Sequence, residues 1–162
     1  MDYLRKVTRE DMDLLYDWAN DLSVRANAFS TDPISYENHV AWFQARLEDP
    51  DTVMYIFIFD DRPVGQIRLD LEGGEAEIDY SIATPYRGKG YGQKMLALLE
   101  VVVQEFLPQI HTLTARVKLE NQPSKHAFLK AGFLEDGLEE VKAQTCIRLI
   151  KHIAQWEKRD TQ

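Results

Sequence analysis

Arg87-Gly88-Lys89-Gly90-Tyr91-Gly92 is the stretch that decides the fold. It follows an alternating, strand-like run over residues 76–83 and leads into an amphipathic helical run over residues 91–106. Glycines let a backbone approach a ligand closely and adopt positive φ, and the N–H groups at the start of a helix attract anions. The order strand, glycine-rich turn, helix therefore predicts a phosphate-binding loop, to which Arg87 and Lys89 add positive charge.

The stretch differs from the two commonest phosphate motifs. The P-loop string G-x-x-x-x-G-K-[ST] does not occur, and the dinucleotide fingerprint G-x-G-x-x-G would need its last glycine one residue after Gly92. The pattern [RQ]-x-x-G-x-[GA] does fit, at Arg87, Gly90 and Gly92. It resembles the loop with which the GCN5-related N-acetyltransferases (GNATs) bind the pyrophosphate of acyl-CoA. A plain helix-entry turn is the alternative interpretation.

The order of the predicted elements supports this resemblance. Helices are expected after the caps Thr8 and Ser35, while residues 20–33 show no clean period. Two more helical runs cover 91–106 and 123–131. Strand-like runs cover 3–7, 53–59, 64–71, 76–83, 111–119, 133–141 and 145–153.

The order β-α-α-β-β-β-α-β-α-β-β resembles the GNAT fold. The resemblance implies an α/β (α+β) fold with about four helices and a mixed, largely antiparallel sheet of six to seven strands, opened between the fourth and fifth. We expect one GNAT domain over residues 1–162, with a polar tail that frays at 157–162.

A second motif begins at Asn121. The family signature N-x-x-[AS]-x-x-x-[YF]-x-x-x-G-F is matched by Asn121, Ser124, Phe128, Gly132 and Phe133. Many GNATs carry a tyrosine general acid where this chain has Phe128, and phenylalanine cannot donate a proton. The N-x-x-S form resembles the ribosomal-protein branch, which places a serine near the sulfur. We therefore expect Ser124 to hydrogen-bond the leaving thiolate and Asn121 to reach the pantetheine arm. The alternative is that both only satisfy the start of a helix.

The resemblance implies how acetyl-CoA would bind. The pantetheine arm would pair with the strand end at Ile82 and Ala83, and an N–H near Ile82 would polarise the thioester carbonyl. The pyrophosphate would bind backbone N–H groups of the loop, with two basic side chains helping. The expected loop residues are Arg87, Gly88, Lys89, Gly90, Tyr91 and Gly92.

A general base must take a proton from the amine acceptor. Glu77 and Asp79 alternate along a strand, so their carboxylates share one face and are the candidates. Either acid could instead bind a cationic amine, or be a solvated carboxylate on a sheet face. Glu120 is a weaker candidate.

Acceptor specificity is expected in the first two helices and their link. Arg25, Phe29 and His39 are the candidate substrate-binding residues, with Arg25 suited to a phosphate or carboxylate. An arginine that is simply solvated, and a histidine at the rim, are the alternatives. Strings over residues 18–43 resemble the branch that acetylates nucleotide-linked amino sugars and, again, the ribosomal-protein branch.

Composition limits the remaining function classes. A net charge of -8 and a pI near 5.0 argue against general nucleic-acid binding. The single cysteine, Cys146, excludes an intramolecular disulfide, fits a reducing compartment and lies in an apolar strand where it would be inert. No apolar run reaches membrane-spanning length, and no His/Cys cluster has metal-ligand spacing. We expect a cytoplasmic monomer or homodimer without a metal.

These observations predict an acetyl-CoA-dependent N-acetyltransferase acting on a primary amine. A nucleotide-linked amino sugar or another small metabolite is the first candidate acceptor, and the terminal amine of a ribosomal-type protein or peptide is the second. A non-catalytic acyl-CoA-binding module is the rival from another class, and Phe128 keeps it open.

Overall fold

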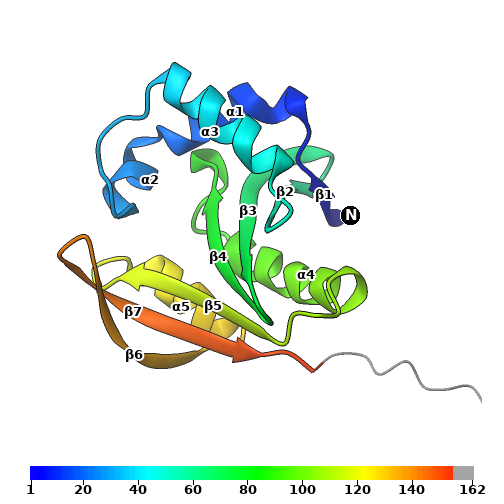
Figure 1. The fold of residues 1–162 in the computed structure, drawn as a ribbon, viewed down its shortest axis with the longest axis vertical. Helices are drawn as coiled ribbons and strands as arrows, with labels where there is room; N and C mark the ends of the chain where they lie inside the picture. Colours follow the sequence, from blue (N-terminus) through cyan, green and yellow to red (C-terminus); the bar gives the residue numbers. More distant parts are fainter. Residues whose placement is uncertain (155–162) are drawn as a thin grey trace, which may run out of the picture.

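The computed structural model describes residues 1–154, so the expectation for the tail at 157–162 lies outside them. A seven-stranded sheet runs through the molecule in the order β1-β2-β3-β4-β5-β7-β6 (Figure 1). All neighbours are antiparallel except β4 and β5. This confirms the predicted fold class. The strands are β1 (Asp2–Lys6), β2 (Thr52–Phe59), β3 (Arg62–Glu72), β4 (Glu75–Ile82), β5 (Thr112–Lys118), β6 (Leu134–Val141) and β7 (Gln144–His152).

Helices cover both faces of the sheet. The helices α1, α2 and α3 lie together on one side of the molecule, and α4 and α5 lie on the other (Figure 1). Within residues 1–154 there are five α-helices, one more than expected. The helical elements are η1 (Arg9–Asp11), α1 (Met12–Ala19), α2 (Leu22–Asn27), α3 (Tyr36–Glu48), η2 (Thr84–Tyr86), α4 (Tyr91–Phe106) and α5 (Gln122–Lys130).

The additional helix is α2, in the segment where the sequence shows no period. Its six residues are too few to display a 3.6-residue repeat. It forms because the side chain of its N-cap, Asp21, accepts hydrogen bonds from the N–H groups of Ser23 and Val24 at 3.0 and 3.2 Å.

The central strand β2 divides the core into two layers. Met54, Ile56 and Ile58 pack against α1 and α3, whereas Tyr55 and Phe57 face α4. All five are buried. A strand covered on both faces has no polar side, and this explains the unbroken apolar run in this part of the sequence.

The strands β4 and β5 are joined over only three residues each. Residues 75–77 pair with 112–114, and beyond that the two strands diverge. The sheet is therefore split at its centre, as the resemblance implies, and the split opens toward the loop that joins β4 to α4.

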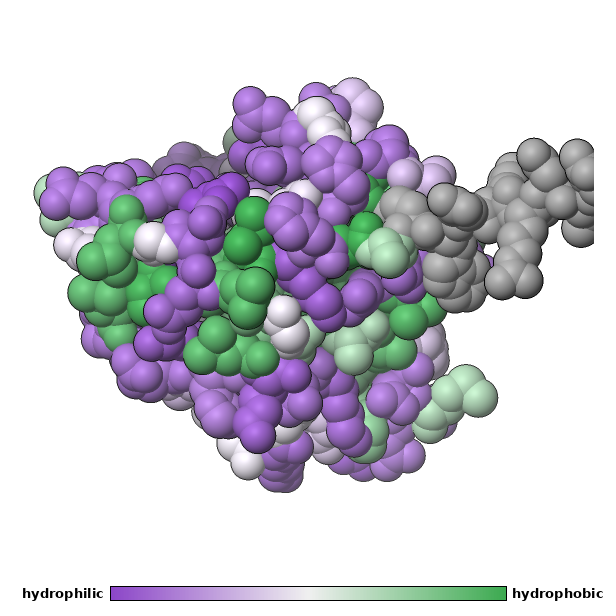
Figure 2. All heavy atoms as spheres, turned by 90° about the horizontal axis from the view of Figure 1, so that it is seen from below, coloured by the Kyte–Doolittle hydropathy of each residue, from purple (hydrophilic) through white to green (hydrophobic). Residues whose placement is uncertain are grey.

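The strand β6 forms one edge of the sheet, and β1 forms the other. The pairing of β6 with β7 is interrupted by an irregularity between Glu135 and Leu138, which disturbs the β6 edge for pairing with another strand. Leu134 and Leu138 of this strand are exposed. Figure 2 shows the molecule from below, where hydrophobic patches alternate with hydrophilic side chains. No helix within residues 1–154 is long and apolar enough to cross a bilayer.

Candidate functional site

The loop between β4 and α4 has the backbone that its glycines predict. Gly88 and Gly90 adopt φ values of +74° and +80°, in the left-handed region that side chains rarely enter. Gly90 is the N-cap of α4, and a Cβ atom added at either glycine would meet nothing within 4 Å. The loop thus turns an exposed backbone outward at the positive end of a 16-residue helix.

Gly92 has a different role. A Cβ atom at this position would lie 3.3 Å from the hydroxyl of Tyr80 on β4 and 3.6 Å from Cβ of Ala127 on α5. The third glycine therefore permits the close approach of β4, α4 and α5, rather than a special turn.

The side chain of Arg87 is committed to the protein. Its Nε donates to the carbonyl of Ile82 at 2.8 Å, and its Nη2 lies 3.0 Å from Oδ1 of Asp21. Thr84 donates to the other oxygen of Asp21 at 2.6 Å. The hydrogen bond from Thr84 and the Arg87 guanidinium lower the pKa of Asp21 to about 2. Arg87 therefore fixes the loop to α2, and the predicted help from two basic side chains reduces to that of exposed Lys89.

The two predicted pantetheine-binding residues differ in the backbone groups they can offer. Ala83 donates its N–H to Val64 at 2.9 Å and accepts from the N–H of Tyr86 at 2.9 Å, so only its carbonyl oxygen could take a further hydrogen bond, and its pairing with the arm stays a prediction. Because alternate residues of a strand direct N–H groups to opposite edges, the Ile82 N–H is directed into the split. Ile82 thus retains the geometry expected of an oxyanion donor.

The start of α5 carries the second motif. Oδ1 of Asn121 accepts from the N–H of Ser124 at 3.3 Å, as a helix cap does. The Ser124 hydroxyl hydrogen-bonds to the Tyr80 hydroxyl. Burial raises the pKa of Tyr80, and the contact with Ser124 acts in the opposite direction. The sequence pattern does not single out Tyr80, because it alternates with Ile78 and Ile82 as a core residue would.

Phe128 is part of the core. Its side chain is only 2% exposed, and its ring packs edge-on against Tyr80 and Phe133 with centroid distances of 5.4 and 5.0 Å. The position that carries a tyrosine acid in much of the family is here filled by a packed apolar ring.

The two predicted acids share the sheet face opposite to Tyr80. Glu77 forms a bidentate pair with Arg116, whose Nε and Nη2 lie 2.5 and 3.0 Å from its oxygens. Asp79 is more exposed and lies at longer range, 3.4 Å from Nε2 of Gln66 and 4.0 Å from Nη1 of Arg68. Of the two, Asp79 is the carboxylate available to a ligand.

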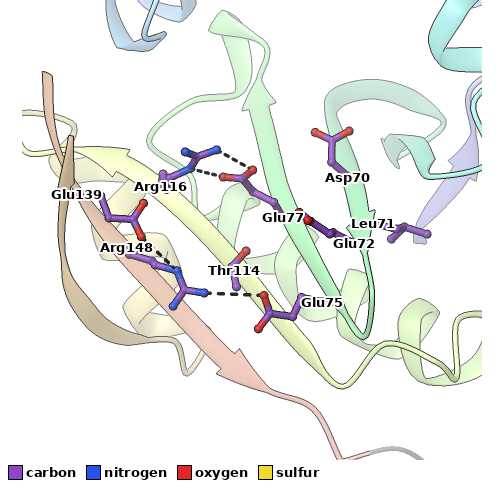
Figure 3. A pocket seen from close by; sticks show the side chains of 9 residues that line it. All are labelled: Asp70, Leu71, Glu72, Glu75, Glu77, Thr114, Arg116, Glu139 and Arg148. Atoms are coloured by element: carbon purple, nitrogen blue, oxygen red, sulfur yellow. Dashed lines mark hydrogen bonds and ion pairs between the residues drawn. The ribbon is translucent and has the colours of Figure 1, made fainter. Parts of the chain in front are cut away.

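A charged hollow of about 250 Å³ lies on this face of the sheet, and Glu77, but not Asp79, is among its lining residues. Figure 3 shows Arg116 of β5 and Arg148 of β7 pointing toward the carboxylates of β4 and β6, whereas Asp70 and Leu71 of β3 point away from this cluster. Arg148 reaches Glu75 at 4.0 Å and Glu139 at 3.5 Å across it. Its lining has five carboxylates against two guanidinium groups: Asp70, Leu71, Glu72, Glu75, Glu77, Thr114, Arg116, Glu139 and Arg148.

A second hollow, of about 190 Å³, lies between the first two helices and the end of β4. Asp17, Trp18, Asp21 and Val24 line it from the helix side, and residues 81–85 with Arg87 line it from the other. It adjoins the open edge of β4, so a ligand in the split would be accessible from this side.

Two of the three predicted substrate-binding side chains, those of Arg25 and His39, are engaged within the protein, whereas for Phe29 only the main-chain carbonyl is engaged and its contact with a substrate stays a prediction. Arg25 donates to the carbonyls of Ala19 at 2.7 Å and Ser30 at 3.0 Å, and the carbonyl of Phe29 accepts from Gln144 at 2.8 Å. His39 is 2% exposed, and its Nε2 lies 2.9 Å from the Met12 carbonyl. Burial lowers the pKa of His39. Packing between α1 and α3 therefore replaces the expected substrate contact of His39.

Comparison with known proteins identifies the class. Residues 3–134 match the family model described as "Acetyltransferase (GNAT) domain". The chain therefore belongs to the GNAT family, and it is an N-acetyltransferase by class. A comparison with curated proteins gives no sequence match.

Solved structures share the fold at low sequence identity. The aminoglycoside acetyltransferase AAC(6')-Ib, in complex with paromomycin and acetyl-CoA, is 18% identical with a TM-score of 0.82, covering 93% of each chain. The spermidine N-acetyltransferase from Vibrio cholerae, in complex with CoA and spermine, is 20% identical with a TM-score of 0.82, covering 93% of this chain and 95% of that one. A GNAT-family acetyltransferase from Streptococcus pneumoniae is 16% identical with a TM-score of 0.76, covering 95% and 100%.

Proposed function

We propose that this protein transfers the acetyl group of acetyl-CoA to a small, positively charged primary amine. The observation that carries the proposal is the backbone of the loop that joins β4 to α4. Two left-handed glycines turn its main chain outward at the N-terminus of α4, beside the split between β4 and β5. Main-chain N–H groups at a helix start suit the pyrophosphate of coenzyme A.

Three groups along the split would carry the transfer. The N–H of Ile82 would polarise the thioester carbonyl and stabilise the oxyanion. Asp79, exposed on the acceptor side of the sheet, would take the proton of the attacking amine, directly or through water. Ser124, at the start of α5, would lie near the sulfur.

The charge of the larger hollow favours a cationic acceptor. Its five carboxylates exceed its two guanidinium groups, which suits an amine with further positive charge. A nucleotide-linked amino sugar carries phosphates, and the guanidinium of Arg25, the candidate for binding them, is held by backbone carbonyls. Of the structures that share the fold, one is a complex with paromomycin and another a complex with spermine.

Calorimetry with acetyl-CoA tests the loop assignment. Gly90→Glu places a bulky negative side chain where the pyrophosphate would bind. We expect the affinity of this variant for acetyl-CoA to fall by at least about 100-fold. Gly73→Glu is the matched control, because Gly73 also has a positive φ (+61°) and open surroundings but lies in the β3–β4 turn. Equal affinity in both variants and in the wild type would exclude the loop as the cofactor site.

A panel of amines then identifies the acceptor. Polyamines and aminoglycosides represent the cationic class, a nucleotide-linked amino sugar the anionic class, and a peptide with a free N-terminus the ribosomal-protein type. The proposal expects the highest kcat/KM in the first class. Binding of acetyl-CoA without acetylation of any amine in the panel would favour a non-catalytic acyl-CoA-binding module. The observation that supports this alternative is the buried Phe128, which cannot donate a proton.

A further inference from the structure

We propose that the phenolic hydroxyl of Tyr80 donates a hydrogen bond to the sulfur of coenzyme A as the thiolate leaves. This inference rests on the proposed function, because it requires the pantetheine arm to lie in the split between β4 and β5. It assigns a role in the reaction to a residue outside both sequence motifs.

The hydroxyl of Tyr80 lies where three elements meet. The ring extends from β4 toward the helices and packs edge-on against Phe128 of α5. The hydroxyl lies above the first turn of α4, where a Cβ atom added to Gly92 would be 3.3 Å from it. It also contacts Ser124 at the start of α5. The hydroxyl therefore lies between the first turn of α4 and the start of α5, where we expect a ligand to run from the loop of α4 into the split.

Strand alternation places Tyr80 opposite the candidate base. Adjacent residues of a strand direct their side chains to opposite faces of the sheet, so Asp79 lies on the same face as Glu77, and Tyr80 faces α4 and α5. A thioester held at this point of β4 would meet the amine from one face. Its sulfur would leave toward the other face, where the Tyr80 hydroxyl lies.

The chemical step balances without a net proton from tyrosine. The amine nitrogen forms its bond to the carbonyl carbon, the C–S bond breaks, and sulfur keeps the electron pair. The protonated amine loses one proton to become nucleophilic and a second as the amide forms, both through Asp79 to water. The thiolate later takes one proton from water, so one proton is released overall. A phenol is a weaker acid than a thiol, with ordinary pKa values of about 10 and 8.5, so Tyr80 keeps its hydrogen and stabilises the charge by hydrogen bonding.

The neighbours of Tyr80 suit this role. A phenolic oxygen can accept a hydrogen bond while its own hydrogen is donated elsewhere, so the contact with Ser124 is compatible with donation from Tyr80 to the sulfur. Burial raises the pKa of Tyr80, which keeps the phenol neutral over the working range. The position on α5 where a tyrosine would otherwise supply a donor holds buried Phe128.

The test compares Tyr80→Phe with Tyr55→Phe in the full-length protein. Tyr55 is also a buried tyrosine on the α4 side of the sheet, but it lies on β2, away from the split. For Tyr80→Phe we expect a loss in kcat of about 10- to 100-fold. We also expect the pKa of the thiol of bound CoA, followed by its thiolate absorption, to rise by about one to two. The control should match the wild type in both.

Two results would overturn the inference, and they are distinguishable. If the wild type and Tyr80→Phe bind CoA equally well and show the same thiol pKa and the same kcat, Tyr80 has no role at the sulfur, and the proposed function stands. If the wild type does not bind CoA at all, the proposed function fails first. The conservative change keeps the ring against Phe128, and a thermal melt that matches the control confirms that the variant is folded.

Discussion

The carboxylate of Asp21 lies 3.0 Å from the guanidinium of Arg87, although the two residues are 66 positions apart in the chain. Asp21 is the N-cap of α2, and Arg87 is the first residue of the glycine-rich stretch. The same carboxylate accepts from Thr84. The side chain of Asp21 therefore connects α2 to the loop between β4 and α4, at the open end of the split.

Removing this connection should destabilise the fold. Asp21→Ala deletes a helix cap and a charged hydrogen-bonding partner, and we expect the free energy of unfolding to fall by about 2 kcal/mol. Urea denaturation measures the change. Asp32→Ala, an exposed aspartate in the loop before α3, is the control and should change stability by less than about 0.5 kcal/mol. Similar losses in both variants would show that the carboxylate of Asp21 is not a stabilising link.

The same residue predicts how stability depends on acid. The pKa of Asp21 is about 2 in the folded protein, against about 3.9 for an ordinary aspartate in the unfolded chain. Because the folded value is the lower one, the stabilisation is fully present above about pH 4 and is lost as the pH falls toward 2. The stability difference between the wild type and Asp21→Asn should therefore shrink by about half between pH 6 and pH 3. A difference independent of pH would contradict the lowered pKa.

The elements that could be predicted from sequence have local causes. The helix over 91–106 was predicted with the bounds observed for α4, because a glycine cap precedes a long amphipathic run. The start of α3 was also predicted, and its N-cap Ser35 accepts from the N–H of Asn38 at 3.2 Å. The split in the sheet followed from the resemblance to a known fold.

The features that could not be predicted depend on contacts between distant segments. Arg87 could not be recognised as the partner of Asp21, nor Glu77 as the partner of Arg116, because pattern reading does not pair residues across the sheet. Tyr80 was not distinguished from its apolar neighbours for the same reason, since only the approach of Gly92 and Ser124 makes its hydroxyl notable. A tyrosine on the core face of a strand beside a split is the signal that could have found it.

Substitution of His39 tests whether this residue has a structural role instead of the predicted contact with the substrate. His39 is buried between helices, stacked on Phe43 with a centroid distance of 5.9 Å. His39→Ala should therefore lower the free energy of unfolding by about 2–3 kcal/mol and leave the KM for the amine unchanged within about twofold. His126→Ala, on the exposed surface of α5, should change neither. A raised KM at unchanged stability would restore His39 to the substrate site.

Phe128→Tyr tests whether a tyrosine at this position can act as the general acid that many GNATs carry there. The added hydroxyl would enter a packed cluster with Tyr80 and Phe133, so we expect a loss of about 1–3 kcal/mol in unfolding free energy and no gain in kcat. Phe128→Leu is the control, because it removes the ring packing without burying a hydroxyl, so a larger loss of stability in Phe128→Tyr would be due to the hydroxyl. Denaturation and steady-state kinetics of both variants provide the measurement. A higher kcat for Phe128→Tyr at full stability would mean that this side chain reaches the cofactor.

The choice between the two acids on β4 follows from their partners. Glu77 is held in a bidentate pair by Arg116, whereas Asp79 has only long contacts and faces the acceptor side beside the split. Protonation of a carboxylate that is paired with a guanidinium breaks the ion pair and is therefore unfavourable, so Asp79 is the better base. Asp79→Asn should lower kcat/KM by about 10²- to 10⁴-fold. Glu77→Gln, the matched control on the same face, should lower kcat/KM by less than about tenfold. If Glu77→Gln causes the larger loss, the proton leaves through Glu77, and Arg116 must move away during turnover.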